Sequence, residues 1–235
     1  MKRILFALAL VASVATSGWA TTYTGSLTSS PNGGLFATQD WAGVTTAGAP
    51  NSSLSWIVDD TTNANLWTYN YIWTGTRKGL SHIIIEVSDT FTKDNIEQIS
   101  SGYDNDAPKT YESTDPSNDG LPADIFGIKW DATGTTFTFS IVTDREPMWG
   151  DMYARDGQTN QQDVYAYNTG IGFDTTAAID NGNAFDQATG RAWALVPDTD
   201  GGIPPIETTV PEPGTIMLLG TGLIGLAFYG RRRMK

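Results

Sequence analysis

Cys and His, the side chains that most often carry chemistry, are almost absent from this sequence. There is no Cys and a single His, His82. The lack of Cys excludes disulfides, thiolate metal sites and Cys nucleophiles, and one His cannot build a two-His metal site within one chain. No Gly-x-Ser-x-Gly nucleophile elbow is present either. We therefore expect His82 to be a hydrogen-bonded structural residue at the start of a strand, and we assign no catalytic residue.

Carboxylates are abundant, and one group has part of the spacing of a calcium-binding loop. Positions 1, 3, 5 and 6 of an EF-hand loop would be filled by Asp115, Ser117, Asp119 and Gly120. Position 12, which needs a bidentate Glu, is Phe126, so this is not an EF-hand. Other oxygen-rich turns hold Asp104 and Asp106, Asp180, Asn183 and Asp186, and Asp198 and Asp200. Because Asp and Asn also favour turns, we expect turn formation with no metal ion or other cofactor, and structural Ca²⁺ is the alternative.

Glycoside hydrolysis would need two carboxyl groups facing each other, and nothing in the sequence singles out such a pair. Between residues 21 and 206 the Glu residues are Glu86, Glu97, Glu112 and Glu146. We therefore expect a protein that is not an enzyme. A secreted glycan-active enzyme is one alternative.

Four aromatic residues alternate with smaller ones in a single run: Trp67, Tyr69, Tyr71 and Trp73. Rings at a spacing of two point to one face of a strand. There they would either fill a core or form a platform on which sugar rings stack. We expect the core. Rings elsewhere, such as Trp41 or Trp149, are further candidates for sugar contacts, so a carbohydrate-binding module is the second alternative.

Alternation of apolar and polar residues predicts the elements that would position these groups. The runs lie at residues 54–58, 67–73, 83–87, 137–141 and 165–173, with shorter candidates at 125–130 and 192–196. A period of two is typical of antiparallel strands with one buried face. The best helix candidate, residues 94–99, is barely a turn and a half. The polar stretch 103–122 predicts a long loop.

These patterns predict an all-β fold, a single antiparallel β-sandwich of the jelly-roll or Ig-like kind over residues 21–197, with a barrel as the alternative. Residues 198–209, rich in Gly and Pro, read as a linker. Residues 40–207 hold 25 acidic and eight basic side chains, a formal charge of −17. Such a charge repels phosphate backbones, so we expect no nucleic-acid partner.

The N-terminus has the three parts of a secretory signal peptide at residues 1–20. Lys2 and Arg3 precede an apolar run, and small residues at 18 and 20 predict cleavage by signal peptidase after Ala20. The mature chain would then start near Thr21, outside the cytoplasm.

The C-terminal tail, residues 210–235, also has three parts. A Val-Pro-Glu-Pro box contains Pro211, Glu212 and Pro213; an apolar stretch at 215–229 predicts a short membrane helix; and a basic cluster follows, formed by Arg231, Arg232 and Arg233. By the positive-inside rule the basic cluster stays in the cytoplasm and the preceding domain lies outside. The two Pro residues keep the segment before the helix extended.

This tail resembles the PEP-CTERM sorting signal, the tag of exosortase substrates in Gram-negative bacteria. The resemblance covers about a tenth of the chain. It implies export across the inner membrane, transient anchoring by the C-terminal helix and processing by exosortase. It further implies delivery to the cell surface or the extracellular matrix, where such proteins are associated with biofilm and exopolysaccharide. Extracellular polysaccharide is therefore a candidate partner.

Overall fold

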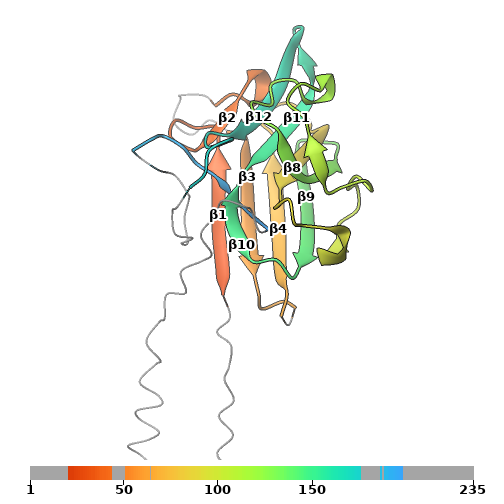
Figure 1. Ribbon diagram of the computed structural model, residues 1–235. Helices are drawn as coiled ribbons and strands as arrows, with labels where there is room; N and C mark the ends of the chain where they lie inside the picture. The colour runs from red at the N-terminus through yellow and green to blue at the C-terminus, as the bar shows by residue number, and fades with distance from the viewer. Residues whose placement is uncertain (1–20, 44–50, 64, 176–185, 187, 198–235) are drawn as a thin grey trace, which may run out of the picture. The chain divides into compact units, whose positions relative to one another are not determined.

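The computed structural model describes residues 21–43, 51–63, 65–175, 186 and 188–197 (Figure 1). The chain divides into two compact units, Met1–Pro204 and Pro205–Lys235, and all described residues belong to the first. Within the described ranges no helix is long and apolar enough to cross a membrane. The predicted signal peptide 1–20, linker 198–209 and tail helix 215–229 lie outside them.

The described part of the chain consists mostly of β-strands, as the period-two patterns predict. The strands are β1 (Thr22–Thr28), β2 (Leu35–Ala37), β3 (Ser53–Asp59), β4 (Trp67–Thr74), β5 (His82–Glu86), β6 (Ile96–Ile99), β7 (Lys109–Tyr111), β8 (Ile125–Asp131), β9 (Thr136–Thr143), β10 (Pro147–Gly150), β11 (Met152–Thr159), β12 (Gln162–Asn168) and β13 (Ala194–Pro197). Three single-turn 3₁₀ helices accompany them: η1 (Gln39–Trp41), η2 (Lys93–Asn95) and η3 (Pro116–Asn118).

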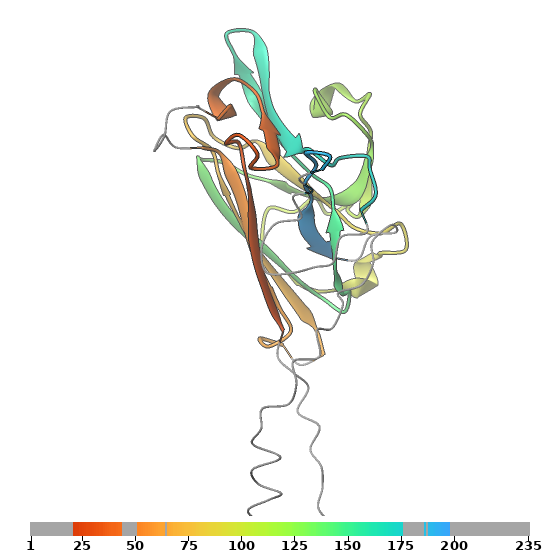
Figure 2. The ribbon, with the colours of Figure 1, turned by 90° about the vertical axis from the view of Figure 1, so that its left-hand side faces the viewer.

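The strands form two large antiparallel sheets and one small one. The five-stranded sheet has the order β1-β3-β4-β9-β6, and the six-stranded sheet has the order β2-β12-β11-β5-β8-β7. Figure 2 shows the long strands of the five-stranded sheet as one layer, with the other strands on one side of it. Strands β10 and β13 pair separately, and all eight of their residues are buried. Strand β13 contacts both β1 and β5, so it lies where the two large sheets meet.

One hydrophobic cluster joins the inner faces of both large sheets. On β3 the alternation predicted from the sequence places Leu54, Trp56 and Val58 in this cluster, and the intervening Ser53 and Ser55 face outward. The six-stranded sheet contributes residues such as Ile83, Ile85 and Trp130. The period-two pattern therefore gave the correct buried face for the central strands.

A second, smaller cluster covers the outer face of the six-stranded sheet. Its buried members are Ile84, Tyr111, Leu121, Ile125, Tyr153 and Ile171. The stretch 103–122, predicted to be a loop, contains β7 and η3, and its end packs on this face through Leu121. For this reason β5 is buried on both sides, although its sequence predicts one buried face.

The best helix candidate, residues 94–99, is not an α-helix. Residues 93–95 form the single turn of η2, and β6 follows and pairs with β9. A β-bulge between Ile96 and Gln98 adds one residue to the strand, so Ile96 and Ile99 both pack against the core at a spacing of three. That spacing imitates a helical period in the sequence.

Strand β12 overlaps the predicted run 165–173 only at residues 165–168, because the chain turns after Asn168. The Tyr-bearing face of this strand is also not the one that fills the central core. Val164 and Ala166 are fully buried there, whereas Tyr165 and Tyr167 face outward and pack against the second cluster. The preceding strand β11 escaped the sequence patterns. It joins β12 through a tight turn in which Asn160 and Gln161 both have positive φ, as a type I′ hairpin turn requires.

Candidate functional site

The aromatic run of β4 belongs to the core, as expected. Tyr69, Tyr71 and Trp73 are fully buried. The hydroxyl of Tyr71 donates a 2.8 Å hydrogen bond to the backbone carbonyl of Leu195 on β13, which supplies a partner for its polar end. Trp67, at the start of the strand, is half-buried and stacks on Tyr23. These rings therefore cannot form a sugar-stacking platform.

The two other Trp candidates for sugar contacts are buried as well. Trp41 is fully buried, its ring lies edge-on to that of Trp73, and its Nε1 donates to the carbonyl of Lys78. Trp149 is 4% exposed and lies near Trp56. The hypothesis that these two rings contact sugar is wrong for the folded chain.

Three outward-facing aromatic rings lie instead at the β2–β12 edge of the six-stranded sheet. Phe36 of β2 pairs in register with Tyr167 of β12, and Tyr165 follows two residues earlier on the same face. The ring centroids of Phe36 and Tyr167 are 4.7 Å apart, and those of Tyr165 and Tyr167 are 6.2 Å apart. We call Phe36, Tyr165 and Tyr167 the ring trio. The sequence analysis did not identify this trio. A signal was present, because Ala166, between the two Tyr residues, is small enough to pack in the central core, which leaves the Tyr residues on the opposite face.

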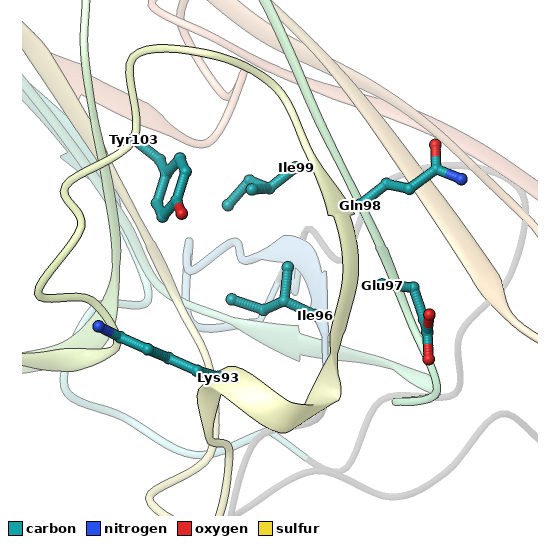
Figure 3. Close-up of a pocket in the computed structure, with 6 residues that line it drawn as sticks. All are labelled: Lys93, Ile96, Glu97, Gln98, Ile99 and Tyr103. Atoms are coloured by element: carbon teal, nitrogen blue, oxygen red, sulfur yellow. The ribbon is translucent and has the colours of Figure 1, made fainter.

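An open hollow of about 220 Å³ lies beside the edge strand β6 (Figure 3). Lys93, Ile96, Ile99 and Tyr103 line one side, while Glu97 and Gln98 point to the other side of the strand. The two Ile residues and Tyr103 also pack against the core. The hollow is thus a gap between β6 and the loop that follows it. Glu97 is the only carboxylate among its lining residues, so it holds no pair of carboxylates.

His82 begins β5, as predicted. We expected its side chain to be hydrogen-bonded, but one of the two ring nitrogens has no partner. The side chain is 7% exposed, its ring lies 5.9 Å from that of Tyr153, and the buried Nε2 has no hydrogen-bond partner. Burial, together with the positive charges of Lys129 and Arg155, lowers the pKa of His82 to about 4. The imidazole is therefore neutral at pH 7 and serves as a packed ring.

The EF-hand-like segment is built as a turn tied to the sheet. The Asp115 carboxylate accepts a hydrogen bond from the backbone N–H of Ser117 and so caps η3, and this bond lowers the pKa of Asp115. Asp119 forms an ion pair with Arg155 at 2.7 Å. Arg155 also donates to the carbonyls of Pro116 and Ser117. Both carboxylates thus have partners within the protein, in agreement with the turn interpretation.

The other described acidic candidates have local partners too. Asp104 accepts from the backbone N–H of Asp106 and pairs with Lys109 at 2.7 Å. Asp186 accepts from the backbone N–H of Ala188 and the hydroxyl of Thr189. Among the residues that the structure describes, no three His, Asp or Glu side chains are arranged to hold a metal ion. The remaining oxygen-rich candidates, Asp180, Asn183, Asp198 and Asp200, lie outside those residues.

The four Glu residues considered for catalysis lie on or beside different elements: Glu86 on β5, Glu97 on β6, Glu112 after β7 and Glu146 before β10. Glu86 accepts from the backbone N–H of Asp151 at 2.5 Å across the end of β5. Asp151 itself is largely buried, which raises its pKa; its carboxylate accepts from Asn168 and from the backbone N–H of Gly172. This cluster ties the end of β12 to the segment that follows it.

The residues predicted to direct sorting all lie outside the described part of the chain: Ala20, Pro211, Glu212, Pro213, Arg231, Arg232 and Arg233. A comparison with known proteins bears on the C-terminal tail alone, and cleavage after Ala20 stays a prediction. Residues 209–233 match the family model described as the PEP-CTERM protein-sorting motif. No curated protein and no solved structure matches the chain.

The family match covers the predicted Pro-Glu-Pro box, the apolar stretch and the Arg cluster, and it leaves the β domain unassigned. The motif supports an exported protein and implies processing by an exosortase and a surface or extracellular location. The chain thus carries, at its C-terminus, the PEP-CTERM sorting signal of an exosortase substrate.

Proposed function

We propose that this chain is a non-catalytic surface or extracellular-matrix protein of a Gram-negative bacterium, associated with biofilm and exopolysaccharide. The observation that carries the proposal is the match of residues 209–233 to the PEP-CTERM sorting motif. The N-terminal segment, with Lys2, Arg3 and small residues before position 21, acts as the signal peptide. Exosortase then acts near Pro211–Pro213 while the apolar tail is still in the membrane.

The β domain acts as a structural or adhesive module in this proposal. Its two large sheets share one buried cluster, and we propose that they pack face to face as a β-sandwich. Which sandwich family it resembles, jelly-roll or Ig-like, stays a prediction. The acidic side chains near η3 and β7 are engaged in caps and ion pairs within the chain, which supports a structural role for them.

Fractionation of an exosortase-bearing host tests the proposal. The full chain carries an epitope tag inserted after Thr133, in the exposed β8–β9 turn. We expect the wild-type chain in the washed matrix fraction. Pro211→Ala together with Glu212→Ala should retain the chain in the membrane fraction, because the extended Pro-Glu-Pro segment is the proposed recognition element.

The matched control is Pro204→Ala with Pro205→Ala, which changes two Pro residues ahead of the matched motif. This variant should be released like the wild type. Normal release of the Pro211/Glu212 variant would refute sorting through the box, and a wild-type chain found only in matrix-free supernatant would refute the matrix role.

A carbohydrate-binding module is the second candidate function. The observation that supports it is the outward-facing ring trio, in which Phe36 is 42% exposed and the two Tyr side chains are half-buried. The third alternative, a glycan-active enzyme, gains no support from the described carboxylates.

A further inference from the structure

His82 lies on the outer face of the six-stranded sheet. Alternation along β5 puts its side chain on the same face as Ile84, a member of the second cluster. In the strand register its neighbours are Arg155 of β11 on one side and Asp131 of β8 on the other. Residues 112–124, which we call the outer segment, pack on this face in the second cluster. The outer segment thus covers the face on which His82 lies.

One ring nitrogen of His82 is buried without a partner. The side chain is 7% exposed, and Nε2 makes no hydrogen bond within the part of the chain that the structure describes. In the neutral imidazole this nitrogen is an acceptor or a donor, but in the protonated ring it is a charged donor. Burying a charge without a hydrogen-bond partner is far more costly than burying a neutral group. The protonated ring therefore needs either water or a new acceptor.

The charged groups around His82 oppose a further positive charge. Lys129 and Arg155 disfavour the protonated ring, and Asp131 favours it. Asp131 is already paired with Lys129 at 3.3 Å, and its side chain is 68% exposed, so water screens its effect. Burial acts most strongly, and with the two cations it lowers the pKa of His82 to about 4. The titratable groups on this face are Lys129 and Asp131 of β8, Tyr153 and Arg155 of β11, Asp163 and Tyr165 of β12, and Asp115 and Asp119 of the outer segment.

The same neighbours of His82 hold the outer segment on the sheet. Arg155 pairs with Asp119 at 2.7 Å and donates to two carbonyls of η3, and Asp163 of β12 lies 3.6 Å from its guanidinium. Tyr153, whose ring centroid is 5.9 Å from that of the imidazole, donates its hydroxyl to the carbonyl of Asp119 at 2.7 Å. Movement of Arg155 and Tyr153 away from a charged imidazole would therefore break the contacts that fix the outer segment.

We propose that His82 is an acid-sensitive latch: when its imidazole takes up a proton, Arg155 and Tyr153 move away from it and the outer segment leaves the sheet. Water then reaches Nε2, and Ile84 becomes exposed with the rest of the second cluster. The central cluster lies on the other face of the sheet and stays packed. The inference goes beyond the proposed function, because it concerns a conformational change of the domain and not its sorting.

The sign of the effect follows from which form binds the proton more tightly. In the closed form the pKa of His82 is about 4, and in the open form the hydrated ring returns to the ordinary 6.5. Acidification below pH 6.5 therefore favours the open form, and the effect is complete below pH 4. Between pH 7.5 and pH 5 the ratio of open to closed molecules should rise about 30-fold.

Hydrogen exchange of the full-length chain in mild detergent, corrected for the intrinsic effect of pH, tests the latch. Protection of the outer segment should fall about 30-fold from pH 7.5 to pH 5. At both pH values the outer segment should exchange faster than β3 and β4, which belong to the central core. Low concentrations of urea should accelerate exchange in β3 and β4 but hardly in the outer segment, because a local opening exposes little surface.

His82→Phe keeps a ring beside Tyr153 but cannot be protonated, so its outer segment should exchange with the same protection at both pH values. Lys78→Met is the matched control, because it removes an ion pair with Asp156 elsewhere on β11 and should keep the 30-fold response. Thermal unfolding of each variant checks that the domain is folded.

The single His gives a second measurement that does not depend on the folding of His82→Phe. The imidazole Cε1–H resonance of the wild type should titrate with a midpoint near pH 4, and Lys129→Met should raise this midpoint by removing an opposing charge. Three results would overturn the latch: a wild-type midpoint near 6.5, an equal pH response in folded His82→Phe, or exchange of the outer segment and the central strands at one common rate.

Discussion

The Trp residues of β4 differ in how deeply they are buried, and burial sets how much each one contributes to the free energy of unfolding. Trp73 is fully buried in the central cluster, whereas Trp67 on the same strand is half-buried. Burial of a large ring removes much apolar area from water, and its deletion leaves a cavity that the packed neighbours cannot fill. Position along β4 therefore decides how much each ring contributes.

Trp73→Ala should lower the free energy of unfolding by about 3–5 kcal/mol, the usual cost of deleting a large aromatic core residue. Trp67→Ala should cost less, below about 2 kcal/mol, because part of its ring already contacts water. Urea unfolding of both variants measures the difference. A loss under about 1 kcal/mol for Trp73→Ala would contradict its place in the core.

His82 should make the domain less stable as the pH falls from 6.5 to 4. Its pKa in the folded chain is about 4, below the ordinary 6.5, so in this window the unfolded chain binds more protons than the folded one. Stability is therefore full above pH 6.5 and decreases on acidification, by up to about 3 kcal/mol for this shift.

His82→Leu should remove this component, and because the chain has a single His, the difference between the two pH profiles isolates it. Urea unfolding at pH 7, 5.5 and 4.5 gives the measurement. Parallel profiles for the wild type and the variant would show that His82 is not held neutral by burial.

At the scale of elements, the segment from β7 to β8 explains why the six-stranded sheet is buried on both faces. The segment reaches across the outer face and places Leu121 in the second cluster. Arg155 on β11 and the Tyr153 hydroxyl, which donates to the carbonyl of Asp119, hold it there. The ring trio lies at the edge of this second cluster.

Arg155→Met should loosen this segment while keeping most of the side-chain volume. We expect a loss of about 1–3 kcal/mol, since hydrogen bonds from a charged donor are removed and carbonyls lose partners. Hydrogen exchange should rise over residues 112–124. Lys78→Met, at the Lys78–Asp156 pair, is the control and should change stability by less than about 1 kcal/mol. Equal effects of the two variants would contradict the anchoring role of Arg155.

The whole domain is dominated by one sign of charge. With a formal charge of −17 over residues 40–207, it repels itself, and added salt should stabilise it by screening. A divalent ion would act the same way unless a specific site bound it. The charge thus predicts ionic-strength dependence without a metal site.

Calcium at about 1–2 mM, the range in which extracellular modules with Kd near 10⁻³ M respond, should raise the melting temperature no more than Mg²⁺ or NaCl at matched ionic strength. The reason is that Asp115 and Asp119 already have partners in η3 and Arg155. Differential scanning fluorimetry gives the comparison. A Ca²⁺-selective rise that disappears in Asp115→Asn or Asp119→Asn would instead make this segment a metal site.

The sequence by itself determined the features that depend only on residues close together in the chain, namely the sorting tail and the alternating strands. The sorting tail is a linear signal, so its box, apolar stretch and Arg cluster could be identified without a fold, and the family match at residues 209–233 confirms it. The antiparallel strands around Trp56, Tyr71 and Phe139 were equally readable, because a strand with one buried face repeats every two residues.

Only the tertiary structure decided which rings meet water. Tyr71 and Tyr165 alternate with smaller residues in the same way, yet one fills the core and the other faces outward, because a period of two fixes that a strand has two faces and not which one is covered. The bulge in β6 and the segment lying over β5 depend on contacts between residues far apart in the chain. The ring trio arises for the same reason, since Phe36 and Tyr167 are brought together only by the pairing of β2 with β12.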